Sequence, residues 1–403
     1  MTAARTMSDG TLPANIGREL AARMVEVRRQ IHRNPELSHD EHNTADLVAR
    51  TLRTAGVTDL VSVFNTGIVA TIRGGKPGRT LALRGDMDAL PIQENRPDLP
   101  FASQNPGVMH ACGHDVHTAI VLGVALELHR KRAELPGTVR VIFQPAEEKE
   151  PVGAPEVIKA GHLKGVDGIL SLHVDPEIPV GSIGVRAGAL LAGGQEFAIT
   201  VRGRASHAAR PHLGIDAIAA TCAIVGELQK IRSRRTDPLE PVVVTIGRIE
   251  GGTASNIIAD KCTILGTLRV LDETLRGEVV RLIAEIAENV ARANGAEATL
   301  DTRTGEPVLY NDPAMTELVR MSAMEILGPD RVREVRRPSM GSEDFAFYVR
   351  EVPGMMMRLG IRNEDAGMIH PLHHPQFAVD ERAIPIGAAV LLAATERFLN
   401  AKS

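Results

Sequence analysis

Apolar side chains recur at helical spacing near the start of the chain. Ile16, Leu20, Met24 and Ile31 are separated by four, four and seven residues, and charged residues occupy most of the positions between them. This spacing places the apolar side chains on one face of a helix. An Asn-Pro pair follows directly and disfavours further helix. We therefore predict a helix over residues 16–32.

Short apolar runs at residues 68–73 and 80–84 are separated by a turn rich in glycine and proline. This pattern predicts two strands joined as a hairpin. The next elements expected are one helix and two buried strands, at residues 119–129, 139–143 and 168–173. Helices that alternate with buried strands are typical of an α/β fold with a largely covered sheet.

The middle of the chain has a different pattern. Strand-like alternation and amphipathic helices indicate three strands and two helices, at residues 197–201, 242–249, 261–270, 215–231 and 274–294. These elements would form a small α+β domain with its helices on one face. The α/β pattern resumes from about residue 307. We therefore expect residues 1–188 and 304–403 to form one domain and residues 189–303 to form a second domain inserted into it.

Composition and charge narrow the possible partners. The 403 residues contain 46 Lys and Arg against 50 Asp and Glu, which gives a net charge of −4, and only 2% are aromatic. Neither a basic surface for nucleic acid or anionic membranes nor a platform for base stacking is indicated. Three scattered cysteines suggest no disulfide framework. No apolar leader is visible in residues 1–10, and no apolar run approaches about 20 residues, so we expect a soluble, cytoplasmic protein.

The densest chemical cluster lies ahead of the 119–129 helix. Cys112 and His114 are separated by one glycine, with further imidazoles at His110 and His117. A thiolate and an imidazole two residues apart can face a single point, which suits a divalent metal of borderline softness. An isolated Cys-Gly-His more often consists of helix-surface histidines and a small buried cysteine, so the interpretation depends on other ligands elsewhere in the chain.

Further candidate ligands stand at the ends of other predicted elements. Glu147 and Glu148 follow the 139–143 strand, and side chains of adjacent residues in extended backbone point in opposite directions. One carboxylate could bind a metal while the other carries a proton. His173 ends the 168–173 strand, and proline-flanked imidazoles, among them His373 and His374, lie near the C-terminus.

About five ligands and one spare carboxylate match what two metals sharing a bridging water require. Asp86 and Asp88 follow the 80–84 strand directly and offer a carboxylate to orient a ligating histidine. The residues therefore predict metal-assisted hydrolysis.

The order of motifs along nearly the whole chain resembles the dinuclear metallopeptidase/aminoacylase family. It is most similar to the branch of hippurate hydrolases, N-acyl-L-amino-acid amidohydrolases and plant auxin-conjugate hydrolases. The segments that carry the resemblance are His32-Arg33-Asn34-Pro35-Glu36, Gly85-Asp86-Met87-Asp88-Ala89-Leu90-Pro91, His110-Ala111-Cys112-Gly113-His114-Asp115, Gln144-Pro145-Ala146-Glu147-Glu148, Gly203-Arg204-Ala205-Ser206-His207-Ala208-Ala209-Arg210-Pro211 and Ser342-Glu343-Asp344-Phe345. The resemblance implies a mixed-sheet catalytic domain of zinc-aminopeptidase-like type, with residues 189–303 as a lid and dimerisation domain.

The resemblance also implies a role for each matching residue. Five residues correspond to the metal ligands: Cys112, His114, Glu148, His173 and His373. His373 is preferred to His374 because the family pattern is Leu-His-x-Pro. Glu147 corresponds to the general base, and Asp88 supports the metal site. His207 corresponds to a residue that reaches the substrate carbonyl in the other subunit, while Asn256 and Arg269 lie where the family binds the substrate carboxylate.

The implied reaction is hydrolysis of N-acetyl, N-benzoyl or related N-acyl amino acids to a carboxylic acid and a free amino acid. It would use two divalent metal ions per subunit, Zn or Mn, with Co or Ni as further options, in a homodimer or dimer-based tetramer. A carboxypeptidase acting on short or N-blocked peptides is the alternative with the same chemistry. A metal-binding protein without catalysis is disfavoured by the acidic Glu147, and a thiol function for Cys112 by the lack of a nearby second cysteine.

Overall fold

The computed structural model describes residues 12–401, so the expectation about a leader in residues 1–10 lies outside the described residues. The chain divides into two compact units. The larger unit comprises Met1–Gly188, Tyr310–Arg336 and Phe347–Ser403, and the smaller unit comprises Ala189–Leu309 and Arg337–Ala346. The smaller unit thus also takes in residues 337–346, which the sequence patterns placed with the C-terminal part of the larger domain.

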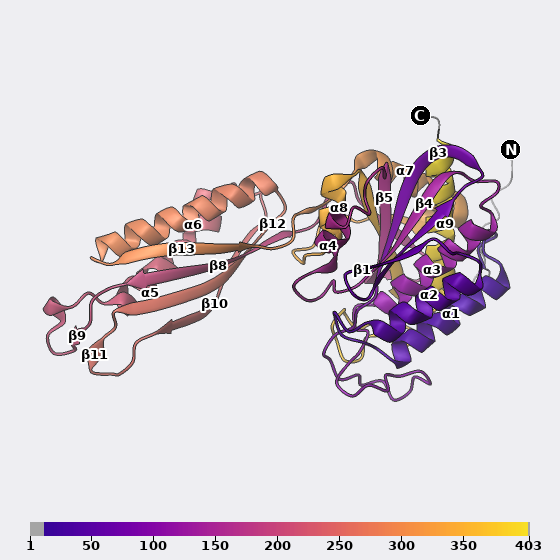
Figure 1. The fold of residues 1–403 in the computed structure, drawn as a ribbon. Coiled ribbons are helices and arrows are strands. Elements are labelled where there is room, and N and C mark those ends of the chain that lie inside the picture. Colours follow the sequence, from indigo (N-terminus) through magenta and orange to yellow (C-terminus); the bar gives the residue numbers. More distant parts are fainter. Residues whose placement is uncertain (1–11, 402–403) are drawn as a thin grey trace. The chain divides into compact units, whose positions relative to one another are not determined.

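The larger unit is built on an eight-stranded mixed sheet (Figure 1). The alternating pattern predicted the α/β fold, and the resemblance implied that the sheet is mixed. Its strand order is β1-β2-β4-β3-β5-β16-β6-β15. The bounds in chain order are β1 (Leu60–Val63), β2 (Gly67–Arg73), β3 (Lys76–Asp86), β4 (Pro136–Gln144), β5 (Gly168–Pro179), β6 (Ile183–Val185), β15 (Val332–Glu334) and β16 (Gly354–Arg362). The central strands β4, β3, β5 and β16 are parallel, and their carboxyl ends therefore meet at one edge of the sheet.

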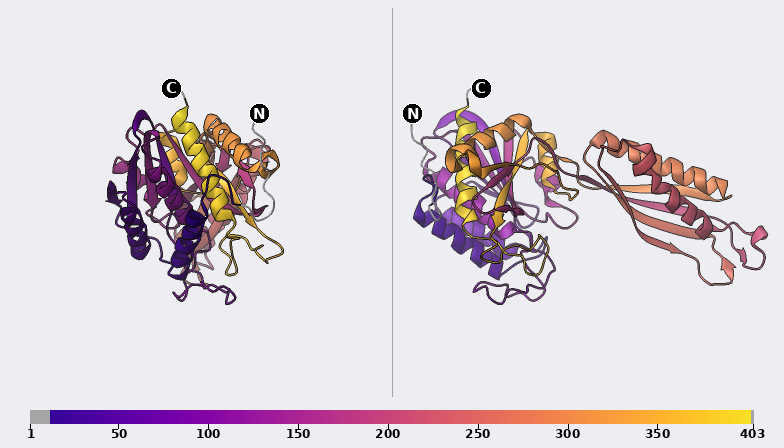
Figure 2. Two further views of the ribbon diagram at one scale, coloured as in Figure 1. Left: turned by 90° about the vertical axis from the view of Figure 1, so that its right-hand side faces the viewer. Right: turned by 180° about the vertical axis from the view of Figure 1, so that it is seen from behind.

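Helices pack along this sheet and around one another. They are α1 (Arg18–Arg33), α2 (His42–Thr54), α3 (His114–Arg130), α4 (Gly153–Lys159), α7 (Pro313–Leu327), α8 (Phe345–Glu351) and α9 (Ala383–Asn400), with a short 3-10 turn, η3 (Pro329–Arg331). Helices α1, α3 and α9 contact one another, and α3 and α9 lie against β3 (Figures 1 and 2). Helix α9 is long and apolar enough to span a membrane, but 78% of its apolar window is buried in the unit, so it is a core helix.

The predicted hairpin between residues 68–73 and 80–84 is wrong. Both strands form, but β4 lies between them, antiparallel to β2 and parallel to β3. The glycines after β2 serve close backbone packing rather than a tight turn: a Cβ at Gly74 would meet the Leu135 carbonyl oxygen at 2.3 Å. Gly74 donates its N–H to the carbonyl of Gly137 at 2.8 Å. The start of β4 therefore occupies the position that a hairpin partner would take.

The smaller unit is a four-stranded antiparallel sheet with two helices on one face (Figure 1). The strand order is β10-β12-β8-β13. The elements are β8 (Gly193–Arg202), β9 (Ser206–His207), η1 (Pro211–Leu213), α5 (Ala217–Leu228), η2 (Ile231–Arg235), β10 (Val242–Gly251), β11 (Ile257–Ile258), β12 (Lys261–Val270), α6 (Glu273–Ala293) and β13 (Glu297–Thr304). Short strands β7 (Gly188–Leu191) and β14 (Leu309–Asn311) lie where the chain passes from one unit to the other.

The core of the smaller unit explains why its strands and helices were visible in the sequence. Ile199 and Ile264 from the sheet pack with Ile224 of α5 and Ile283 of α6, all fully buried. Strand β13 was not predicted. It forms an edge strand whose outer half is polar and exposed, so only part of it carries the apolar alternation that marks a strand.

Candidate metal centre and active site

The turn into α3 brings a thiol and an imidazole together. Gly113 adopts φ +84°, a left-handed conformation that L side chains rarely take, and a Cβ there would meet the side chain of Val174 at 2.5 Å. Glycine is therefore required both by the turn and by the close approach of β5. The turn leaves Cys112 and His114 buried at the same point, with His114 as the first residue of the helix.

Three other elements carry the remaining candidate ligands to this point. Glu148 follows β4, His173 lies on β5, and His373 lies in the loop before α9. The Sγ of Cys112 is 3.5 Å from Nε2 of His173, and Nε2 of His373 is 3.3 Å from Oε1 of Glu148. The structure therefore brings together all five residues that the resemblance matched to metal ligands. Their donor atoms form overlapping groups in which every pair lies within 4.8 Å.

Two donor atoms in this cluster have no hydrogen-bond partner among the described residues. They are Nε2 of His114 and Oε1 of Glu148, both buried and 3.9 Å apart. Buried polar atoms are almost always satisfied, so an unpaired imidazole nitrogen beside an unpaired carboxylate oxygen indicates a missing partner. A cation fits both atoms, and the mixture of sulfur, nitrogen and oxygen donors suits a divalent transition metal or zinc.

Asp88 orients one of these ligands. Its Oδ1 lies 3.1 Å from Nδ1 of His114, while Oδ2 accepts hydrogen bonds from Ser38 Oγ at 2.7 Å and from the backbone N–H of Glu148 at 2.9 Å. Burial alone would raise the pKa of Asp88, but these hydrogen bonds and the nearby imidazole lower it. The carboxylate holds the proton of His114 on Nδ1 and leaves Nε2 as a lone pair for a metal.

The backbone turns sharply just before Glu147 and Glu148, and their carboxylates converge on one site instead of pointing apart as extended backbone would place them. Ala146 adopts φ +52°, which is rare for a residue with a side chain. A carboxylate oxygen of Glu147 lies within 4.8 Å of donor atoms of both His114 and Glu148. The site therefore holds a second carboxylate beside the candidate ligands, half-buried and positioned to exchange a proton with a molecule bound there.

The structure distinguishes between the adjacent histidines of the C-terminal loop. The nearby side chains of Cys112 and Glu148 raise the pKa of His373 to about 10. His374 instead accepts the backbone N–H of Gln376 on Nδ1 at 3.0 Å, and its ring stacks on His370 with centroids 4.4 Å apart. Among the described residues, the donor groups around Cys112 include His373 and omit His374.

A buried network beside the cluster was given no role by the sequence reasoning. His32 of α1 lies 2.8 Å from Asp115 and 3.0 Å from Glu94, and Arg28 donates to Asp115 at 2.7 Å. Asp115 directly follows His114, so the network fixes the first turn of α3. The sign of this network in the sequence is that Arg28 and His32 lie on the otherwise apolar face of α1, where charged residues are uncommon, and two interruptions of this kind are a weak signal.

The three candidate substrate-binding residues belong to the smaller unit and are described within it. His207 is exposed on β9, and its Nδ1 accepts the N–H of Ala209 at 3.1 Å, so Nε2 carries the proton and is able to donate it. Asn256 is exposed, and its carbonyl accepts the N–H of Ala208 at 3.0 Å, beside the paired strands β9 and β11. On β12, Nη1 of Arg269 is buried and has no hydrogen-bond partner among the described residues.

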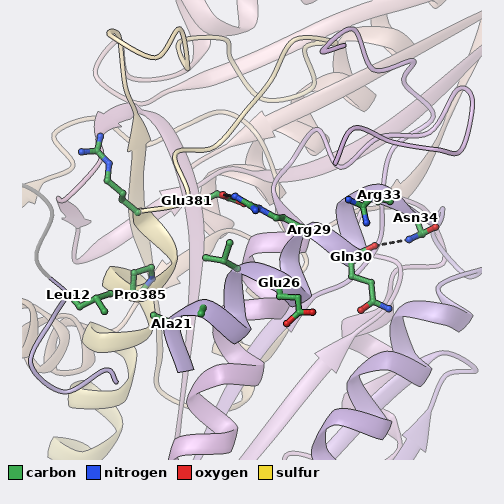
Figure 3. A pocket seen from close by; sticks show the side chains of 12 residues that line it. Leu12, Ala21, Glu26, Arg29, Gln30, Arg33, Asn34, Glu381 and Pro385 are labelled. Atoms are coloured by element: carbon green, nitrogen blue, oxygen red, sulfur yellow. Dashed lines mark hydrogen bonds and ion pairs between the residues drawn. The ribbon is translucent and has the colours of Figure 1, made fainter. Parts of the chain in front are cut away.

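A separate groove of about 860 Å³ runs along α1 and the start of α9 (Figure 3). Its charged lining is paired internally, since Arg29 donates to Glu381 at 2.9 Å. None of the candidate site residues lines this groove. The chemistry of the larger unit is therefore concentrated at the edge where β4 and β5 end rather than in this surface groove.

Comparison with known proteins agrees with this geometry. Residues 82–397 match the family described as Peptidase family M20/M25/M40. A "Probable hydrolase sll0100" of Synechocystis sp. is 43% identical over 94% of this chain and 96% of its own length. An N-acetyl-L-cysteine deacetylase of Bacillus subtilis is 37% identical over 98% and 92%, and thermostable carboxypeptidase 1 of Saccharolobus solfataricus is 39% identical over 95% and 97%.

Solved structures show the same fold. The Bacillus subtilis YXEP protein, described as a dinuclear metal binding peptidase from the M20 family, superposes with a TM-score of 0.83 at 35% identity. The superposition covers 95% of this chain and 99% of that protein. The chain therefore belongs to peptidase family M20/M25/M40 and is an amide-bond hydrolase with a candidate site for divalent metals.

Proposed function

We propose that this protein is a metal-dependent amidohydrolase that cleaves N-acetyl, N-benzoyl or related N-acyl amino acids to a carboxylic acid and a free amino acid. The observation that carries the proposal is the pair of unpaired buried donors, His114 Nε2 and Glu148 Oε1, with the carboxylate of Glu147 beside them. The similarity to an N-acetyl-L-cysteine deacetylase supports the substrate class.

Five residues would hold two divalent ions, Zn or Mn in the first instance, with Co or Ni also compatible: Cys112, His114, Glu148, His173 and His373. Ions bound there would act as Lewis acids that polarise an amide carbonyl and make water a better nucleophile. Asp88 keeps His114 in the tautomer that binds through Nε2. The mixture of sulfur, nitrogen and oxygen donors in this ligand set is compatible with all four metals.

Glu147 would carry the proton during the reaction. As general base it takes a proton from the attacking water, and as general acid it returns that proton to the nitrogen of the leaving amino acid. The nearby Glu148 is engaged as a ligand, so the two adjacent carboxylates have separate tasks. The left-handed backbone at Ala146 turns the chain just before them, and both carboxylates lie beside His114.

Groups on the smaller unit would recognise the substrate. The protonated Nε2 of His207 can donate a hydrogen bond to the developing oxyanion, and in a dimer that oxyanion would belong to the partner's site. Arg269 has a buried, unpaired Nη1 and would bind the α-carboxylate of the amino acid. This contact would favour amino-acid conjugates over simple amides. Asn256 lies beside His207 at the opposite end of β12 and, like His207, would reach a substrate only across a dimer.

The same groups would serve a carboxypeptidase, because a peptide also ends in an α-carboxylate next to an amide bond. The similarity to thermostable carboxypeptidase 1 makes short or N-blocked peptides the second candidate substrate class. The two activities differ only in the group on the acyl side of the scissile bond.

We further propose a homodimer, or a tetramer built from dimers, working in the cytoplasm. Large apolar side chains of the smaller unit are exposed near its β9–β11 end: Leu213, Ile218, Ile249 and Ile257. Exposed clusters of this kind are typical of interaction surfaces. The three free cysteines fit a reducing compartment.

Release of free amino acid from a panel of substrates tests the function. N-acetyl, N-benzoyl and longer N-acyl amino acids are compared with N-blocked dipeptides, using chelated protein before and after addition of Zn or Mn. Metal-dependent release from an acyl class supports the amidohydrolase. Release from the peptides alone would replace it by the carboxypeptidase, and no release from a protein with both metals bound would contradict both.

A further inference from the structure

A buried chain of hydrogen bonds links the strands beneath the candidate metal centre. It begins at Gln144 of β4, whose Oε1 accepts from Nε of Arg84 at 2.9 Å. Arg84 is paired with Asp86, both on β3 and both fully buried. The other oxygen of Asp86 lies 2.7 Å from Nδ1 of His117 on α3. These hydrogen bonds thus connect β4, β3 and α3, and a further bond from His117 leads to β5.

The hydrogen bonds of His117 determine which of its nitrogens carries the proton. The backbone N–H of Val174 donates to Nε2 of His117 at 2.9 Å, so Nε2 is the acceptor and bears no proton. Nδ1 therefore holds the proton and donates it to Asp86. The other oxygen of Asp86 is paired with the buried guanidinium of Arg84, which keeps Asp86 ionised. The acceptor for His117 is accordingly a carboxylate.

The residue whose N–H donates to His117 also orients His173 through its carbonyl. The carbonyl of Val174 accepts the Nδ1–H of His173 at 2.7 Å. His173 is thereby fixed with its lone pair on Nε2, the atom that lies 3.5 Å from Sγ of Cys112. The two imidazole rings lie with their centroids 4.7 Å apart. One residue, Val174, therefore joins His117 on its N–H side to His173 on its carbonyl side.

We propose that His117 is a positioning residue for His173: it holds the Val174 backbone so that His173 presents Nε2, together with Cys112, to a metal ion. This inference rests on the proposed function only in taking His173 and Cys112 as ligands. It assigns a task to a histidine that lies close to the donor atoms of Asp86 and His114 and would otherwise pass for a ligand itself. Both nitrogens of His117 are already engaged, so it has no lone pair to offer.

Two substitutions separate the positioning role from simple filling of space. In His117→Leu, both hydrogen bonds are lost, and the N–H of Val174 and Oδ1 of Asp86 lose their partner, while Oδ2 of Asp86 stays paired with Arg84. In His117→Gln, the amide oxygen can accept from Val174 while the amide nitrogen donates to Asp86, so the donor and acceptor pattern is kept. His129→Gln, at the far end of the same helix and only partly buried, is the matched control.

The measurement is the affinity of metal-free protein for Co²⁺ and Zn²⁺ in competition with a chromophoric chelator. The thiolate-to-cobalt charge-transfer absorption of Cys112 is recorded alongside it. We expect His117→Leu to weaken one of two binding steps by roughly 10- to 100-fold and to change the cobalt spectrum. His117→Gln should restore both toward the wild type, and His129→Gln should leave both unchanged.

Unchanged metal affinities in His117→Leu would overturn the proposal. An equal loss of metal affinity in the Leu and Gln variants would also overturn it, because that is the result expected if His117 were itself a ligand. Should the Leu variant fail to fold, His117→Asn replaces it, because the shorter amide can reach only one of the two partners. Wild-type protein that binds metal but hydrolyses no substrate would contradict the proposed function and leave the positioning role standing. Wild-type protein that binds no metal would contradict the ligand assignment and the positioning role together.

Discussion

The carboxylate of Glu41 accepts a hydrogen bond at 2.7 Å from the backbone N–H of Ala146, the residue held at φ +52° directly before Glu147. A second hydrogen bond, from Thr66 Oγ1 at 2.7 Å, fixes Glu41 itself. A left-handed alanine costs about 1–2 kcal/mol and persists only where its surroundings hold it. Glu41 therefore stabilises the backbone turn that leads into Glu147 and Glu148.

Replacing Glu41 tests this relationship. Glu41→Leu leaves the N–H of Ala146 and the hydroxyl of Thr66 without their buried acceptor, so the turn should relax and kcat should fall about tenfold or more, with a smaller change in KM. Glu41→Gln keeps an oxygen for Ala146 and should retain most activity. Steady-state kinetics at full metal occupancy measure both. Glu36→Leu, which removes a carboxylate that caps α2, is the control and should affect thermal stability more than kcat.

Glu147→Gln removes the proposed proton carrier while preserving the size of the side chain. We expect kcat to fall by roughly 10²- to 10⁴-fold, the range typical of general acid–base catalysis. Metal content, measured by elemental analysis, should not change because Glu147 is not among the proposed ligands. Glu156→Gln, a partly exposed position on α4, should behave as wild type. Turnover retained by the Glu147→Gln variant would remove the base assignment.

Asp88→Asn changes the group that holds Nδ1 of His114. An amide can turn its N–H₂ toward His114 and favour the wrong tautomer, which would place the proton on Nε2. We expect metal affinity to fall by roughly 10- to 100-fold, as measured by chelator competition. Ser38→Ala, which removes only one hydrogen bond to the same carboxylate, should produce a smaller loss. Equal losses would show that the contact with His114 is not the important one.

Arg269→Ala should weaken recognition of a free α-carboxylate. The guanidinium can form a paired, charge-assisted hydrogen bond with that group, so we expect KM for an N-acyl amino acid to rise by roughly tenfold or more. The same N-acyl amino acid with an amidated carboxyl group should be a poor substrate for the wild type and be little affected by the substitution. Arg248→Ala, on the neighbouring strand and paired with Glu250, serves as the matched control. A similar KM for both forms of the substrate would contradict the assignment.

The buried His32 predicts how stability changes with pH. Burial and the charge of Arg28 act to lower its pKa, but the carboxylates of Asp115 and Glu94 outweigh them and raise it above 6.5. A raised pKa in the folded state means that the stabilisation is complete below about pH 6.5 and is lost as the pH rises through the folded pKa. The same contact lowers the pKa of Glu94, so its contribution is lost as the pH falls below about 4.5.

Comparison of the wild type with His32→Asn in denaturant unfolding, both free of metal, measures this effect. The difference in free energy of unfolding should be largest between about pH 5 and 6.5 and should shrink toward pH 9. A difference that stays constant across this range would mean that His32 stabilises the helix by packing and hydrogen bonding in its neutral form.

Several helices and the main chemical motifs of this protein were determined by local sequence. The period of apolar residues placed α1, α3 and α6, and short motifs such as Cys112-Gly113-His114 and Glu147-Glu148 named the chemistry at the ends of the elements. Both signals depend on a few neighbouring residues. Helical periodicity repeats from one turn of a helix to the next, and the left-handed Gly113 brings the donor atoms of Cys112 and His114 together. The mixed α/β fold, the family and the amide-hydrolase chemistry were predicted on this basis and are confirmed.

Only the tertiary structure decided which distant groups become partners. It inserted β4 between β2 and β3 where local pattern indicated a hairpin, and it chose His373 over its neighbour for the cluster. It also joined Glu41 to Ala146 and His117 to Val174 across 105 and 57 residues. Strand order and the pairing of buried polar atoms depend on which surfaces can be packed together without leaving a donor or acceptor unsatisfied. That condition involves the whole core at once, so no short segment of sequence expresses it.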